Sequence, residues 1–86
     1  MANIVSIKQE LSRRVRLRRR EVKMSQALLA AKSGVSLGSI KRFESTGEVS
    51  LSALLRIAFV LGYEDDFNQL FARANYRSLD EVIHAR

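Results

Sequence analysis

Residues 26–44 have the sequence QALLAAKSGVSLGSIKRFE, and this stretch decides the fold. It contains two helical segments of about eight residues, separated by a three-residue connection that begins at Gly34. Glycine accepts the left-handed backbone conformation that most residues avoid, so one helix can end there and the next can begin at a sharp angle. Ser25 and Ser36 precede the two segments, where a hydroxyl can cap the first turn. The stretch therefore predicts two short helices joined by a tight turn over residues 25–44.

The small and apolar residues indicate how these two helices pack. Ala30 is expected where the helices cross most closely, since only a small side chain fits there. Ile40 and Phe43, three positions apart, are expected to face inward. This is the arrangement of a helix-turn-helix, whose second helix enters the major groove of DNA, although an αα-hairpin of an unrelated bundle has similar apolar spacing. The outward-facing residues would be Ser36, Leu37, Ser39, Lys41 and Arg42.

The residues before this stretch predict one cationic helix. It is expected to begin after Asn3 or Ser6, with Ser6 and Gln9 forming a capping box. Most of its surface is arginine, including the run at 16–20. Two interpretations stay open for these arginines: extra contacts with phosphates beside the groove, or a solvated helix face. The buried residues are predicted to be Leu11, Val15 and Val22.

A fourth helix is predicted to open at Ser50 or Ser52 and to end at Gly62. Apolar residues surround most of its circumference, so we expect it to be central and buried. The residues expected in the core are Leu51, Leu54, Leu55, Ala58 and Leu61.

A fifth helix is predicted to start at Asp65 and Asp66, because acidic residues suit the positive end of a helix dipole. Phe67, Leu70 and Phe71 are expected to face the core. Residues 1–72 would then form a single all-α DNA-binding domain. Residues 73–86 would form a short C-terminal tail, with apolar side chains that contact a second copy, another protein or this domain itself.

Composition narrows the class of function. The chain has 86 residues and a net charge of +6, and residues 1–43 hold eleven of the 15 basic side chains but two of the nine acidic ones. Such asymmetry suits a protein that faces a polyanion on one side. With no cysteine and a single histidine, His84, we expect no enzyme, no cofactor and no metal site. Without an apolar run of about 20 residues or a signal-peptide core, we expect a cytoplasmic, nucleoid-associated protein that does not bind membranes.

These features resemble the Cro/cI-like (lambda repressor-like, XRE) helix-turn-helix family over roughly residues 11–71. The resemblance rests on Ser25–Gln26 at the start of the first helix, on Ala30, Gly34, Ile40 and Glu44, and on the later run LSALLRIAFVLG at 51–62. It implies a compact five-helix lambda repressor-like domain. It also implies a homodimeric transcriptional regulator, a repressor, that binds double-stranded DNA with the helix beginning at residue 37.

The resemblance also implies residue roles. Gln26, Ser36 and Ser39 would contact phosphate or sugar. Leu37, Gly38 and Arg42 would face base edges with Lys41 close by, although the family usually has a polar side chain at the position of Gly38. Arg19 and Glu44 would form a partly buried salt bridge. The DNA-binding set is Arg19, Ser25, Gln26, Ser36, Leu37, Gly38, Ser39, Lys41 and Arg42, and the structural set is Arg19, Ala30, Gly34, Ile40, Phe43 and Glu44.

Two other functions stay open. Residues 62–71 (GYEDDFNQLF) and 76–82 (YRSLDEV) resemble HipB-type antitoxins, which repress their own operon and bind a HipA-like kinase toxin. A basic module that binds RNA or membrane is less favoured. No aromatic side chain lies among the arginines for bases to stack on, and the first helix lacks the bulky apolar face that a membrane-surface helix needs.

Overall fold

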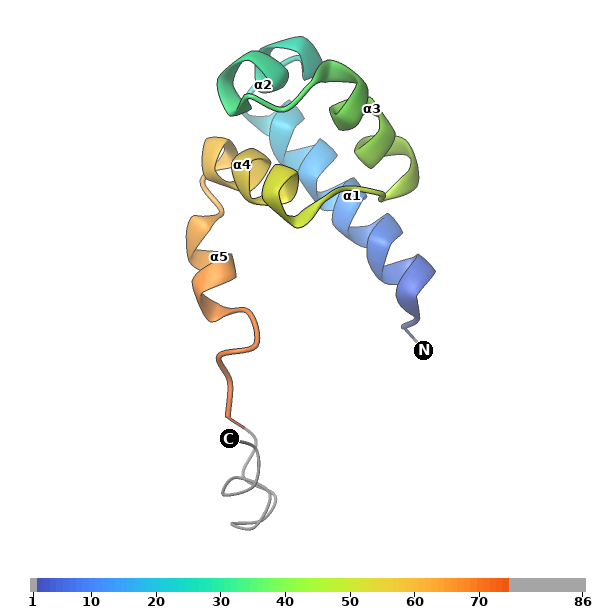
Figure 1. Cartoon of the computed structure of the whole chain (residues 1–86), viewed down its shortest axis with the longest axis vertical. Helices are drawn as coiled ribbons and strands as arrows, with labels where there is room; N and C mark the ends of the chain where they lie inside the picture. The colour runs from blue at the N-terminus through green and yellow to red at the C-terminus, as the bar shows by residue number, and fades with distance from the viewer. Residues whose placement is uncertain (1, 75–86) are drawn as a thin grey trace.

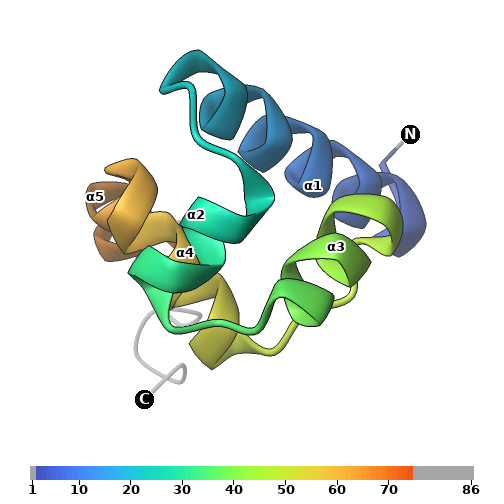
Figure 2. The same ribbon diagram turned by 90° about the horizontal axis from the view of Figure 1, so that it is seen from above.

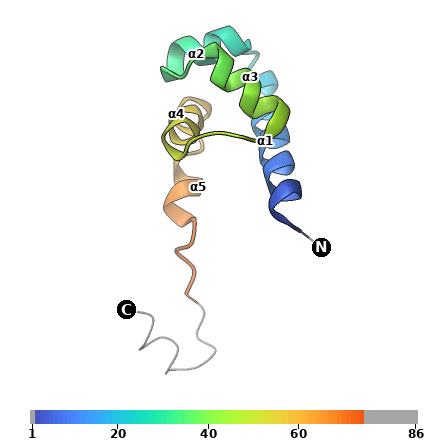
Figure 3. The ribbon, with the colours of Figure 1, turned by 45° about the vertical axis from the view of Figure 1, so that its right-hand side comes forward.

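The computed structural model describes residues 2–74, which form five helices (Figure 1). Helices α2 and α3 lie at one end of the molecule (Figure 1) and, seen from above, form an angled pair joined by the turn at 34–36 (Figure 2). Helix α5 extends from the end of α4 away from that pair (Figure 3). The five-helix arrangement agrees with the prediction. The helices are α1 (Ile4–Glu21), α2 (Gln26–Ser33), α3 (Leu37–Thr46), α4 (Leu51–Leu61) and α5 (Glu64–Gln69).

The boundaries of α2, α3 and α4 follow the serine and glycine positions in the sequence. Each begins after a serine whose hydroxyl oxygen accepts a hydrogen bond from a backbone N–H three residues later. Each ends at a glycine with a left-handed φ between 74° and 84°. The caps are Ser25, Ser36 and Ser50, and the terminating glycines are Gly34, Gly47 and Gly62.

The start of α1 differs from the predicted capping box. Asn3 is the N-cap, and its Oδ1 accepts a hydrogen bond from the Ser6 backbone N–H at 2.8 Å. In return, the Ser6 hydroxyl oxygen accepts from the Asn3 backbone N–H at 2.9 Å. The predicted pairing of Ser6 with Gln9 is therefore wrong, because Ser6 is the N3 residue, the last of the box, and not its N-cap.

The core lies between α1, α2, α3 and α4. Phe43, Leu29, Ile40 and Ile57 are its largest fully buried side chains, with Val15, Val35 and Leu61 around them. Ile40 and Phe43 face inward as predicted, and Ala30 packs against the edge of this cluster. These contacts fix the orientation of α3 relative to α1 and α4.

Four predicted core residues are exposed instead. Val22 lies beyond the last turn of α1, and Leu51 lies in the first turn of α4 on its outward side. Helix α5 has six residues and ends before Leu70, so Leu70 is 51% exposed and Phe71 is 93% exposed. Apolar spacing alone does not show that α5 stops before these side chains reach the core.

Gly47 has a second role besides ending α3. A Cβ atom at this position would lie 2.7 Å from the Lys8 Cβ and 2.9 Å from the Lys8 carbonyl oxygen. The turn after α3 therefore packs directly on the backbone of α1, at a distance that only glycine permits. None of the helices within residues 2–74 combines the length and the apolar character that crossing a bilayer requires.

Candidate nucleic-acid interface

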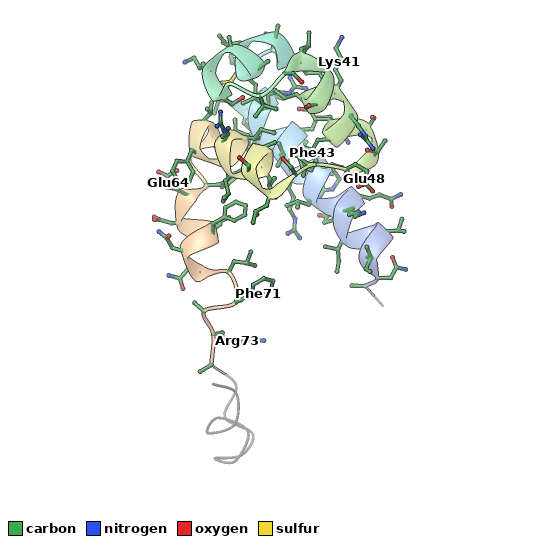
Figure 4. The ribbon with its side chains drawn as sticks, in the orientation of Figure 1. Lys41, Phe43, Glu48, Glu64, Phe71 and Arg73 are labelled. Carbon is green, nitrogen blue, oxygen red and sulfur yellow. The ribbon has the colours of Figure 1, made fainter. Side chains whose placement is uncertain are left out.

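Helix α3 has an inward face and an outward face of different chemistry. Ile40, Phe43 and Glu44 are buried. Of the first six residues of α3, all except Ile40 are exposed to solvent. Figure 4 shows Lys41 directed away from the body of the protein. The outward surface, called here the α3 face, consists of Leu37, Gly38, Ser39, Lys41 and Arg42.

The cationic side chains of the α3 face are not neutralised within the protein. Among the ion pairs of residues 2–74, none involves Lys41 or Arg42. An unpaired guanidinium on an exposed helix can donate two hydrogen bonds to the O6 and N7 atoms of guanine. An ammonium group can neutralise a phosphate.

The serines at the start of α3 are partly used by the fold. The Ser36 oxygen accepts from the Ser39 backbone N–H at 3.1 Å, and the Ser36 hydroxyl donates to the Ser39 hydroxyl oxygen at 2.8 Å. Ser36 is thus committed to capping, whereas the Ser39 hydroxyl keeps its own hydrogen to donate. The Ser25 oxygen similarly caps α2 by accepting from the Leu28 backbone N–H at 3.0 Å.

Gly38 is the one residue of the α3 face whose identity the fold does not explain. Its φ is not positive, and a Cβ added there would meet no atom within 4 Å. Glycine inside a helix is less favourable than alanine by roughly 0.5–1 kcal/mol. Its effect is to leave the backbone of α3 uncovered at the centre of the outward face.

A buried ion pair joins α1 to α3. The Arg19 Nε donates to Glu44 Oε2 at 2.7 Å, and its NH2 group donates to Glu44 Oε1 at 2.9 Å. The third guanidinium nitrogen donates to the Met24 carbonyl oxygen at 2.9 Å. Arg19 and Glu44 are 8% and 4% exposed. This arrangement supports the structural role predicted for Arg19 and argues against its predicted contact with DNA, because all three nitrogens already donate inside the protein.

Glu44 is the centre of a larger set of contacts. Gln26 Nε2 donates to Glu44 Oε1 at 3.0 Å, and an Arg16 guanidinium nitrogen donates to the Glu44 carbonyl oxygen at 2.9 Å. Burial raises the pKa of the Glu44 carboxyl, but the hydrogen bonds from Arg19 and Gln26 and the charges of Arg19 and Arg16 outweigh it, so the pKa lies below its usual value. Gln26 thus contributes one donor to the interior and keeps a second amide hydrogen to donate.

Three arginines of the run at 16–20 are used inside the protein. Besides Arg16 and Arg19, Arg18 Nε donates to the Leu61 carbonyl oxygen at 3.2 Å, and its guanidinium lies 5.9 Å from the centre of the Tyr63 ring. Arg19 is buried and is therefore not part of a solvated face, whereas Arg16 and Arg18 are partly exposed and each donates one hydrogen bond inside the protein. The three side chains satisfy backbone carbonyls and a carboxylate at the junctions of α1 with α3 and α4.

Two further groups of charged residues lie on α1 and on α5. Arg13 and Arg14 both donate to Glu10, and the hydrogen bond from Arg13 is the main reason that the pKa of Glu10 falls to about 2. Three acidic residues, Glu64, Asp65 and Asp66, form the first turn of α5. Figure 4 shows Glu64 on the opposite side of α4 from Lys41. The acidic first turn of α5 thus lies away from Lys41, whereas Glu44 and Glu48 of the acidic half pair with Arg19 and Lys8 of α1.

A capped, outward-facing helix that follows a glycine turn and is held by α1 and α4 defines the helix-turn-helix class of DNA-binding folds. Residues 15–68, more than half of the chain, match the helix-turn-helix family HTH_3, which comprises Cro/cI-type XRE domains, and the chain belongs to this family. The matched domain is a DNA-binding, non-enzymatic domain. No curated protein and no solved structure matches the sequence.

Some interior contacts were missed at the sequence level. No signal in the sequence indicated the contacts of Arg16 and Arg18, since their partners are backbone carbonyls of α3 and α4.

Lys23 adopts a left-handed φ of 57° after α1, a position that usually carries glycine. His84 was predicted to take part in no catalytic or metal site, and it lies outside the described residues. Among residues 2–74, no three His, Asp or Glu side chains gather into a group that could hold a metal ion.

Proposed function

We propose that this chain is a sequence-specific transcriptional regulator, a repressor, that binds double-stranded DNA as a homodimer with α3 in the major groove. The observation that carries the proposal is the division of α3 into a buried face and an outward, unpaired basic face. Membership of the HTH_3 family supports the same mode of binding. Residues 1–72 would form the DNA-binding domain.

Each residue of the interface would have its own role in DNA binding. Arg42 would donate to a guanine, and Leu37 would pack on a thymine methyl group. Lys41, Ser39 and the second amide hydrogen of Gln26 would contact phosphate or sugar. Ser25 and Ser36 would act chiefly through the helix starts that they cap, which present backbone N–H groups to phosphate.

Selection of bound sites from a pool of random duplexes tests the proposal. A dimer with a twofold axis selects an inverted repeat whose half-sites are centred about 34 Å apart, which is one turn of DNA. Enrichment of such a repeat supports both specificity and dimeric binding. Enrichment of a single half-site would overturn the homodimer, and a pool without enrichment would overturn sequence-specific binding.

A second candidate function is an antitoxin of the HipB type that regulates its own operon. Phe71, 93% exposed just after the end of α5, favours contact with another protein, because aromatic side chains are enriched at protein–protein interfaces. Affinity purification of the full chain from its source cells tests this function. Recovery of a kinase-like protein that is lost in Phe71→Asp supports it, and recovery that is unchanged in Phe71→Asp would contradict the role of this surface.

A further inference from the structure

A groove runs along the side of the molecule opposite the α3 face. Its volume is about 930 Å³, and residues from α1, α4 and α5 line it, with none from α2 or α3. Figure 3 shows the first half of α1 and the whole of α5 extending below α4. The apolar lining includes Ile7, Leu11, Leu54, Ala58, Phe67 and Leu70.

Part of this lining lies outside the DNA-binding core. The family match covers residues 15–68, whereas Ile7 and Leu11 precede it and Leu70 follows it. Ile7 is 56% exposed and Leu70 is 51% exposed. Apolar side chains that gather along one groove indicate a surface that another element covers.

The sequence beyond Ala74 supplies an element of suitable pattern. Tyr76, Leu79, Val82 and Ile83 follow one another at three, three and one positions, so in a helix they would share one face. Ser78 and Glu81 have the spacing of a capping box. Asp80 would stand at the edge of the apolar face, where it could meet Arg14 or Arg18 on the rim of the groove.

Chain connectivity favours the segment of the same molecule over that of a second copy. Leu70 lines the groove, and Ala74, the last described residue, follows it by four positions in the sequence. Five residues from Ala74 to Leu79 span up to about 17 Å, which is enough for the chain to reverse. A short tether gives an effective concentration of about millimolar, so docking within one chain outcompetes docking between chains in dilute solution.

We propose that residues 76–83 dock as an amphipathic helix in this groove of their own chain, between α1 and α5. The groove shares no lining residue with the α3 face, so the proposal does not depend on DNA binding. Docking would cover Ile7 and Leu70 and would hold the first half of α1 against α5.

Because the chain contains no cysteine, an engineered pair reports on this contact directly. In the full-length variant Ile7→Cys/Val82→Cys, a short bismaleimide is expected to join the two thiols within one chain and to give a product of monomer mass. The control variant Lys32→Cys/Val82→Cys, with its first thiol on exposed α2, is expected to react at least tenfold more slowly. A product of dimer mass would overturn docking within one chain, and equal rates in the two variants would overturn the contact itself.

Amide hydrogen exchange gives a second measurement on the full chain without DNA. Leu79→Asp is expected to speed exchange in residues 4–11 about tenfold while leaving α2 and α3 unchanged, and the control Arg77→Asp, on the polar side of the segment, is expected to change neither. Unchanged exchange in Leu79→Asp would contradict the proposal. Since neither experiment contains DNA, their outcome is separate from that of the site selection.

Discussion

The carboxylate of Glu44 on α3 and the guanidinium of Arg19 on α1 are joined by two hydrogen bonds of 2.7 and 2.9 Å inside the protein. The pair stands directly behind the α3 face, because Glu44 follows Phe43 on the buried side of that helix. It fixes α3 against α1 with a directional contact, which the surrounding apolar side chains do not provide. The orientation of the outward residues thus depends on a pair that is buried inside the protein.

Removing one partner of this pair should be costly. In Glu44→Ala we expect the free energy of unfolding to fall by about 3–5 kcal/mol, because Arg19 is left charged and buried. Chemical denaturation measures it. The matched control is Glu48→Ala, which removes the exposed pair of Glu48 with Lys8 and should cost no more than about 1 kcal/mol. Equal losses in the two variants would contradict the importance of burial.

The pH dependence of stability should report the same carboxylate. The pKa of Glu44 is lower in the folded protein than in the unfolded chain, so its stabilising contribution is complete above the unfolded value of about 4.3 and is lost as the pH falls through the folded value. The stability difference between the wild type and Glu44→Gln should therefore shrink from pH 7 to pH 3. Glu10 and Glu48, whose pKa values are also lowered, affect both proteins alike. A difference that stays constant over this range would contradict the shift.

Gly47 should tolerate substitution less than the other helix-ending glycines. In Gly47→Ala the new Cβ would lie 2.9 Å from the Lys8 carbonyl oxygen. The alanine would also have to adopt a left-handed φ. We expect a loss of more than about 2 kcal/mol, against about 1 kcal/mol for Gly62→Ala, where the φ is similar but the nearest atom lies 4.0 Å away. Thermal melts of the two variants make the comparison. Similar melting temperatures would show that α1 moves aside readily.

Salt titrations should separate the inward arginines from the outward lysine. Lys41→Ala is expected to lower the slope of log K against log salt by about 1 and to weaken binding to all duplexes alike. Arg18→Ala is expected to leave the slope unchanged while lowering the melting temperature, because its guanidinium binds Leu61 and lies over Tyr63. A slope that falls in Arg18→Ala as much as in Lys41→Ala would place Arg18 at the phosphates.

The local features of the fold were predictable from the sequence because their signals are local. Serine before each of α2, α3 and α4 and glycine after each fix their ends within one or two residues. The inward orientation of Ile40 and Phe43 followed from their spacing. The ion pair of Arg19 with Glu44, separated by 25 positions, came instead from the resemblance to a known family, since no spacing rule connects residues on different helices.

The errors concern where helices stop and what long side chains reach. Apolar spacing placed Leu70 and Phe71 in the core, but α5 ends first. For Arg16 and Arg18 the sequence left open phosphate contact or a solvated face. In the structure each donates a hydrogen bond to a backbone carbonyl oxygen of another helix. A pattern of charges along one helix carries no information about such tertiary acceptors.

The affinity of three full-length proteins for one selected duplex tests the role of the α3 face most directly. Arg42→Ala is expected to bind about 5- to 150-fold more weakly than the wild type, which corresponds to the loss of one guanine contact. Arg14→Ala, which removes an exposed arginine on the groove side, is expected to bind within about twofold of the wild type. Equal affinity of all three proteins, or an equal loss in both variants, would contradict DNA recognition through α3.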